Sequence, residues 1–127
     1  MAILRQALDK LEFVNFHATA TRTATGSATG VDMQQYDGDF VLILDSAAGT
    51  GTTPTLAVTI EHSDALGSGY TAISGAAFTA VATTASAQKL VISKDEAKRY
   101  VRVTYTLGGT NPSFTFSVNG VGVKKYG

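Results

Sequence analysis

The chain of 127 residues has the length of a single domain with one hydrophobic core. Ten basic residues balance ten acidic ones, so the formal net charge is zero and the electrostatic attraction that dominates nucleic-acid binding has no source. The absence of cysteine excludes disulfide bonds, thiolate nucleophiles and zinc–thiolate sites.

Charged residues make up only 16% of the sequence, whereas hydrophobic residues make up 44%. The surface must therefore be built largely from Thr, Ser, Gly and Ala, and a surface with so little charge is poorly protected against association. The first residues lack the apolar stretch of a signal peptide, and no apolar run approaches the ~18 residues that span a bilayer. We expect neither a secretion signal nor a membrane anchor.

Residues 1–12 are predicted to form an arm that precedes a single β domain over residues 13–127. Leu4, Leu8 and Leu11 recur at helical spacing. The arm is therefore expected to be either two or three turns of helix or a segment that becomes ordered only on binding.

The first half of the domain contains three segments with β character. Residues 11–16 predict the first strand, and the alternation of Thr with mostly Ala over 17–25 predicts an extended segment. This segment is either an edge strand or a strap laid over a neighbouring subunit. The continuous apolar run 40–44 predicts a central strand covered on both faces, followed by a loop over 47–54.

The alternation of apolar with small or polar residues over 56–61 predicts a half-buried strand that ends at Ser63-Asp64. A turn at 67–69 leads to a returning partner strand over 70–73, and a weaker strand is expected over 78–81. These segments indicate an antiparallel arrangement of short strands.

Residues 89–92 predict another strand, and the capping-box sequence at 93–96 predicts one helical turn after it. The most regular alternation of the chain, over 100–107, predicts a strand that ends at Gly108-Gly109. The last long strand covers 114–118.

Asn119-Gly120 is the dipeptide favoured in two-residue type I′ hairpins, so a tight turn is expected there. Altogether the pattern gives seven or eight short strands separated by turns. It predicts an all-β fold: a two-sheet antiparallel β-sandwich or jelly roll with an extended or short helical N-terminal arm.

The sequence gives little support for a catalytic or metal-binding site. His17 and His62 lie on different predicted strands, and period-2 geometry places Glu61 and His62 on opposite faces, so surface or strand-end roles are favoured over metal binding. The carboxylates lie beside turn residues, and no Gly-x-Ser-x-Gly motif occurs. We expect no enzymatic activity, no metal and no cofactor.

The basic residues Lys94, Lys98, Arg99 and Arg102 cluster before and within the predicted strand 100–107. They form either a solvated face or a docking site for an acidic protein surface. Separately, tyrosines could stack on sugars or anchor an interface; Tyr105 is expected in the core or on a sheet face, and Tyr126 is expected to be exposed.

Four segments of the chain resemble small structural proteins of tailed-phage virions: Tyr36-Asp37-Gly38, Val58-Thr59-Ile60-Glu61-His62-Ser63-Asp64, Tyr70, and Ala97-Lys98-Arg99-Tyr100-Val101-Arg102-Val103. In those proteins a strand ends near a Glu-Ser-Asp-type turn, and a later strand begins with Tyr-Val-Arg-Val. The resemblance spans about residues 31–118 and does not account for the Thr/Ala-rich stretch before Gly26.

Such proteins include capsid decoration, or cement, proteins. The resemblance implies a compact β-sandwich or jelly roll bound in many copies outside the major capsid lattice, without catalytic residues. We therefore expect a virion structural protein, made in the host cytoplasm and located on the capsid surface, that stabilises the head by bridging capsid subunits.

The expected partners are the major capsid protein or other virion subunits and further copies of the chain, as a dimer or trimer, with no nucleic acid and no membrane. The alternative is a carbohydrate- or receptor-binding β-sandwich module of a virion fibre or tail component. The residues expected to contact partners are Ile3, Leu4, Leu8, Leu11, Thr21, Arg22, Lys125 and Tyr126.

Overall fold

The structure is a computed structural model that describes residues 11–34, 36–93 and 96–124. Its secondary structure is entirely β, and every strand pair is antiparallel. The strands are β1 (Leu11–Arg22), β2 (Gly26–Ser27), β3 (Val31–Asp32), β4 (Tyr36–Ser46), β5 (Thr50–Ser63), β6 (Thr71–Ala77), β7 (Ser86–Ile92) and β8 (Tyr100–Lys124). None of the described residues forms a helix of the length and apolarity that a bilayer span requires.

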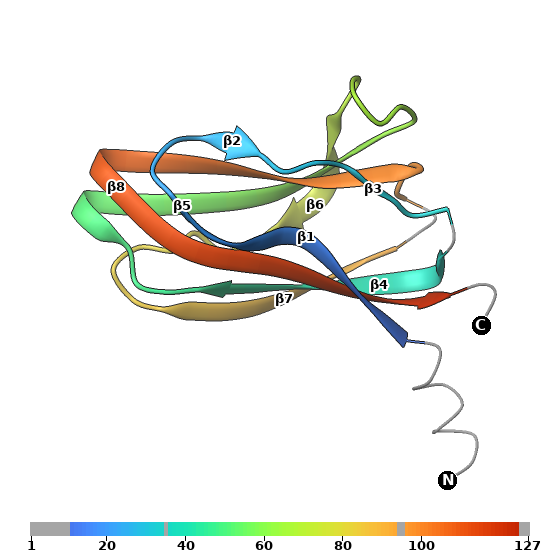
Figure 1. The fold of residues 1–127 in the computed structure, drawn as a ribbon, viewed down its shortest axis with the longest axis horizontal. Helices are drawn as coiled ribbons and strands as arrows, with labels where there is room; N and C mark the ends of the chain where they lie inside the picture. Colours follow the sequence, from blue (N-terminus) through green and yellow to red (C-terminus); the bar gives the residue numbers. More distant parts are fainter. Residues whose placement is uncertain (1–10, 35, 94–95, 125–127) are drawn as a thin grey trace, which may run out of the picture.

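The long strand β8 connects two sheets, as Figure 1 shows. Its first half pairs with β5 on one side and with β2 and β3 on the other, while its second half pairs with β4 and β1. One sheet therefore has the order β6-β5-β8 with β2 and β3 beyond β8, and the other has the order β7-β4-β8-β1. The predicted antiparallel sandwich is confirmed.

The bend in β8 lies where the sequence predicted the end of a strand. Gly109 has a φ of +99° and Asn111 a φ of +50°, both in the left-handed region that glycine and asparagine tolerate best. Pairing resumes beyond the bend, because Ser113 faces Thr50 and Phe114 faces Arg22. The bend thus turns the chain from one sheet into the other without ending the strand.

The core lies between the inner faces of the two sheets. Alternate residues of β5 and of the first half of β8 point inward, as the period of two requires, so the alternations predicted over 56–61 and 100–107 hold. The buried side chains that form its centre are Leu42, Leu44, Leu56, Val58, Ile60, Val101, Val103, Phe114, Phe116 and Val118.

Strand β4 is central, as predicted, because it lies between β7 and β8. Its predicted coverage on both faces is wrong. Leu42 and Leu44 are fully buried, whereas Ile43 between them is 37% exposed. An antiparallel sandwich covers each sheet on one face only, so a continuous apolar run does not require a second covering layer.

The predicted hairpin at Asn119-Gly120 is also wrong. Gly120 lies within β8, between Val14 of β1 and Leu42 of β4. A Cβ atom at this position would collide with the ring of Phe16 and come within 3.1 Å of Leu42 Cδ2. The glycine is therefore needed for close packing between strands and not for a turn.

Other strands begin or end at different residues from those predicted. β6 ends at Ala77, and the strand predicted over 78–81 is reduced to an isolated bridge between Val81 and Leu56. β5 already begins at Thr50, within the predicted loop. The Thr/Ala-rich segment continues β1 as far as Arg22 along the edge of its sheet, which matches the edge-strand alternative.

The N-terminal arm predicted for residues 1–12 lies outside the described residues over positions 1–10, and Leu11 and Glu12 are the first residues of β1. Of the helical turn predicted at 93–96, the structure describes the two ends: the backbone N–H of Glu96 donates to the carbonyl of Ser93 at 3.1 Å.

Candidate interaction surfaces

The outer face of the β7-β4-β8-β1 sheet carries a row of apolar side chains. The strand register aligns Phe13 of β1 with Val121 of β8, Val121 with Val41 of β4, and Val41 with Val91 of β7. Directly paired residues point to the same face of a sheet, so these four side chains, the apolar row, cross it from edge to edge. Phe13 is 75% exposed and Val91 60% exposed, while the two central valines are half-buried.

Neighbouring positions widen the apolar row. Leu11 is exposed and pairs with Val123 on one side of it, and Ile43 lies on the other side between Asn119 and Lys89. Contiguous exposed apolar side chains on a soluble domain mark surfaces that another molecule covers. This outer face is therefore a candidate interface.

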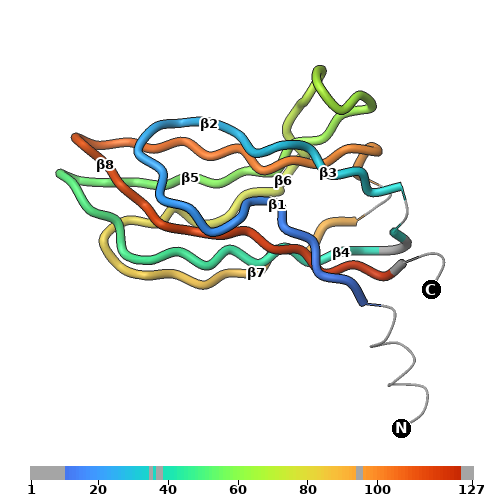
Figure 2. Tube along the Cα trace, in the orientation of Figure 1, coloured from blue at the N-terminus to red at the C-terminus, as the bar shows by residue number. Residues whose placement is uncertain are grey.

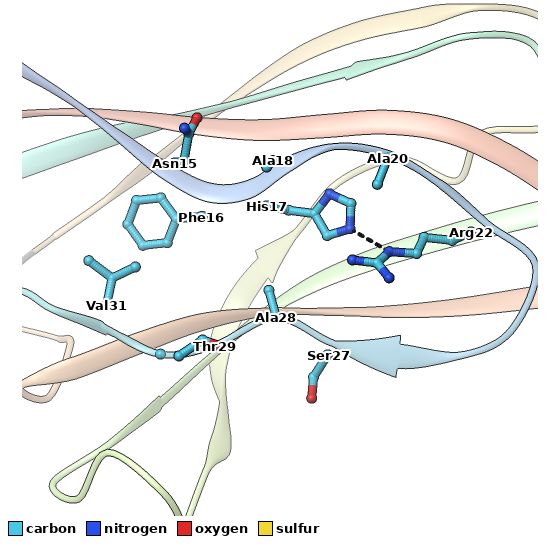
Figure 3. A pocket seen from close by; sticks show the side chains of 11 residues that line it. Asn15, Phe16, His17, Ala18, Ala20, Arg22, Ser27, Ala28, Thr29 and Val31 are labelled. Carbon is cyan, nitrogen blue, oxygen red and sulfur yellow. Dashed lines mark hydrogen bonds between the residues drawn. The ribbon is translucent and has the colours of Figure 1, made fainter.

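A second candidate surface lies at the open side of the sandwich, between β1 and the segment that contains β2 and β3. Figure 2 follows the chain from β1 in one sheet to β2 beside the first half of β8 in the other. A groove of about 500 Å³ remains between the two segments. The side chains drawn in Figure 3 line it: Asn15, Phe16, His17, Ala18, Ala20, Arg22, Ser27, Ala28, Thr29 and Val31, together with Gly30.

His17 is positioned in this groove by irregularities of β1. A regular strand would place Phe16 and His17 on opposite faces, but the register of β1 against β8 shifts on either side of His17, and both side chains are 2% exposed. The imidazole stacks on Phe116 with ring centroids 4.2 Å apart and meets Tyr105 edge-on at 5.3 Å. The predicted surface or strand-end role is therefore wrong for His17.

The environment of His17 favours the neutral imidazole. Burial, and secondarily the charge of Arg22, lowers the pKa of His17 below its ordinary value of 6.5. Nε2 accepts a hydrogen bond from Arg22 Nε at 3.0 Å, so the remaining proton belongs on Nδ1, which has no hydrogen-bond partner among the described residues. The ring thus acts as an acceptor that orients the arginine.

Arg22 is held from two sides. Besides the hydrogen bond to His17, its guanidinium carbon lies 5.4 Å from the centroid of the Tyr105 ring. Figure 3 shows the guanidinium group in the space between His17 and the β2 segment. Among the described residues, no carboxylate pairs with it.

Unlike Arg22, the described members of the basic cluster, Lys98, Arg99 and Arg102, form ion pairs with carboxylates of the same chain. Lys98 lies 3.8 Å from Asp64, Arg99 lies 2.9 Å from Asp32, and Arg102 lies 2.8 Å from Glu61. The hydrogen bonds from Arg99 lower the pKa of Asp32. These pairs neutralise much of the positive charge, which weakens the interpretation of the cluster as a docking site for an acidic surface.

His62 accepts a hydrogen bond at Nδ1 from the backbone N–H of Lys98, at 3.2 Å. The described residues contain no group of three or more His, Asp or Glu side chains arranged to hold a metal ion. Tyr70, one of the tyrosines that could stack on a sugar, donates its hydroxyl proton to the Leu66 carbonyl and has the Arg102 guanidinium 4.1 Å from its ring centroid. The cation covers a ring face that a sugar would need.

The structure separates the described residues predicted to contact partners. Leu11 borders the apolar row, Thr21 lies on the sheet surface with its Oγ1 2.7 Å from Thr115 Oγ1, and Arg22 lies in the groove. Ile3, Leu4, Leu8, Lys125 and Tyr126 lie outside the described residues. Phe13 and Val91 were missed as contact candidates, because alternation identifies the two faces of a strand but not which of them stays uncovered.

No protein-family model matches the chain, and a search of curated proteins gives no match. The fold is nevertheless similar to solved structures. The PBSX exported protein XepA is 21% identical with a TM-score of 0.57; the match covers 92% of this chain and 38% of XepA.

Two further similar structures are a prophage-derived protein and a protein of a subviral particle. The SPBc2 prophage-derived protein YomS is 13% identical with a TM-score of 0.51, and the match covers 90% of this chain and 93% of YomS. In the VP2 subviral particle of infectious bursal disease virus, identity is 12% and the TM-score 0.52, over 90% of this chain and 32% of VP2. The similarity to all three is one of fold.

Proposed function

We propose that the chain is a structural protein of a tailed-phage virion, and more specifically a capsid decoration protein that bridges capsid subunits on the outside of the head. The observation that carries the proposal is the apolar row, which presents Phe13 and Val91 on an outer sheet face. Burial of such a face against a larger assembly would contribute binding free energy without any reactive group.

Three further observations support a structural role. The net charge of zero and the small fraction of charged residues favour association. The described residues offer no metal cluster, and the ionic groups near His62 are occupied by structural pairs, so we propose that the chain is not an enzyme. Two of the similar folds belong to a prophage-derived protein and to a virus particle protein.

The proposed partners are the major capsid protein or neighbouring virion subunits, with the chain bound as a dimer or trimer. A subunit that touches two neighbours gains avidity, so each individual contact needs only moderate affinity. Attachment in many copies would reinforce boundaries between capsid subunits.

Co-sedimentation with phage particles that lack the chain tests this function. The wild-type chain should pellet with the particles, and Val91→Ser should reduce the bound fraction at least about fivefold, since an interface valine loses its buried apolar area. Leu66→Ser is the matched control, because Leu66 is similarly exposed, at 50%, but lies in the turn between β5 and β6. Equal binding of both variants and the wild type would contradict the proposed attachment face.

A further inference from the structure

We propose that the groove between β1 and the β2–β3 segment binds an extended peptide segment of a partner chain, and that Arg22 holds a carboxylate side chain of that segment. This site lies between the two sheets at the free edge of β1, whereas the apolar row lies on an outer face. The inference therefore goes beyond the proposed attachment surface and is independent of it.

The walls of the groove are strands with an unused edge. β1, β2 and β3 each pair only with β8 within the part of the chain that the structure describes. The backbone N–H and C=O groups on their other edges can accept an added strand, which is how many domains bind extended peptides.

The size and lining of the groove suit a peptide backbone. Its volume of about 500 Å³ falls within the range of roughly 300–1,000 Å³ found for ligand sites. Ala18, Ala20 and Ala28 line it, and their small side chains allow another backbone to approach closely. Ser27 and Thr29 add hydroxyl groups that can donate to or accept from that backbone.

Arg22 gives the groove a preference for a negatively charged ligand. A guanidinium group carries five N–H donors, and only Nε–H has a hydrogen-bond acceptor in the described structure, His17 Nε2. The ring of Tyr105 fixes the guanidinium from a second direction. An oriented guanidinium binds a carboxylate through two parallel hydrogen bonds, so the group that best completes this site is an Asp or Glu side chain.

The other described arginines each pair with a carboxylate, which Arg22 does not do within the described residues. Arg99 donates two hydrogen bonds to Asp32, from Nε and from an Nη atom, and Arg102 pairs with Glu61. Each of these pairs forms within the chain. No described carboxylate reaches Arg22, so its Nη groups can receive the carboxylate of the proposed peptide.

Titration of the isotope-labelled chain with two peptides tests the inference by nuclear magnetic resonance. The probes are the acetylated and amidated heptapeptide Thr-Val-Thr-Asp-Thr-Val-Thr and the same peptide with Asn in place of Asp. The Asp peptide should shift the backbone amides of Ala18, Ala20 and Thr29 in a saturable manner. It should bind about tenfold more tightly than the Asn peptide, as expected for hydrogen bonds between charged groups.

Variants assign the preference to the arginine. Arg22→Gln should bind both peptides with equal, weak affinity, and Arg22→Lys should keep only part of the preference because lysine lacks the planar fork. Arg99→Gln is the control and should behave like the wild type. Unchanged amide positions away from the groove verify that each variant is folded, and if Arg22→Gln is not folded, Arg22→Lys decides.

Three results would overturn the inference. Equal affinity of the wild type for the two peptides would remove the role of the carboxylate. A preference that survives in the folded Arg22 variants would remove the role of Arg22. Acetate that produced the same shifts as the peptide at the same concentration would show a simple anion site without an extended ligand. Failure here would leave the particle-binding result with Val91→Ser unaffected.

Discussion

Substitution of Gly120 tests the packing between β8 and its two neighbours. Because Gly120 does not have a positive φ, an alanine fits its backbone, and the cost comes from the added methyl group against Phe16 and Leu42. Overpacking of this kind costs about 1–3 kcal/mol, and the loss of glycine flexibility in the unfolded chain returns about 0.4–1 kcal/mol. The net destabilisation expected for Gly120→Ala is therefore about 1–2 kcal/mol.

Thermal and urea unfolding followed by circular dichroism measure this change. For a domain of this length, 1–2 kcal/mol corresponds to a decrease in Tm of about 4–8 °C. Gly67→Ala is the control, because a Cβ atom at Gly67 has no neighbour within 4 Å, and its stability should stay within about 0.5 kcal/mol of the wild type.

A third variant separates close packing from a hairpin turn. Asparagine is larger than alanine but tolerates the left-handed conformation of a type I′ turn. Packing against Phe16 and Leu42 predicts that Gly120→Asn is less stable than Gly120→Ala. Greater stability of the asparagine variant, or wild-type stability of Gly120→Ala, would refute the strand assignment of this position.

Three further predictions concern the groove, the surface and the arm. Because the pKa of His17 is lowered in the folded chain, the unfolded chain takes up the proton first, and the unfolding free energy should fall as the pH drops below about 6.5. His17 contributes at most about 1.4 kcal/mol per pH unit to this fall. In urea titrations, His17→Phe should flatten the slope between pH 6.5 and 5, and an unchanged slope would contradict this prediction. Phe13→Ser should change thermal stability by no more than about 0.5 kcal/mol, since the side chain is mostly exposed, and a larger loss would mean that Phe13 supports the fold itself. Deletion of residues 1–10 should weaken co-sedimentation with particles while the circular dichroism spectrum stays β-type; undiminished attachment would remove the arm from the interface.

The strands with strict alternation could be predicted from the sequence, because a period of two directly encodes one buried face. Val58 and Ile60 in β5, and Val101 and Val103 in β8, lie in the core for this reason. Gly120 was misassigned because the Asn-Gly signal is local, whereas the need for glycine there comes from Phe16, more than 100 positions away in the sequence.

The candidate surfaces were less accessible to sequence analysis. The burial of His17 depends on register shifts in β1 that alternation does not reveal, so its contact with Arg22 five positions along the strand could not be derived. Val91 belongs to a correctly predicted strand, but it is exposed because none of the described strands covers the outer face of its sheet. Both features follow from the way strands are paired, which the sequence pattern of a single strand does not contain.

Electron cryomicroscopy of phage particles that carry the chain would show whether it lies on the outside of the head and which face it turns to the shell. We expect density for the chain at regular positions on the outside of the head, with the β7-β4-β8-β1 sheet turned toward the shell so that Phe13 and Val91 are covered. Particles without this density, or a bound chain whose apolar row faces the solvent, would contradict it.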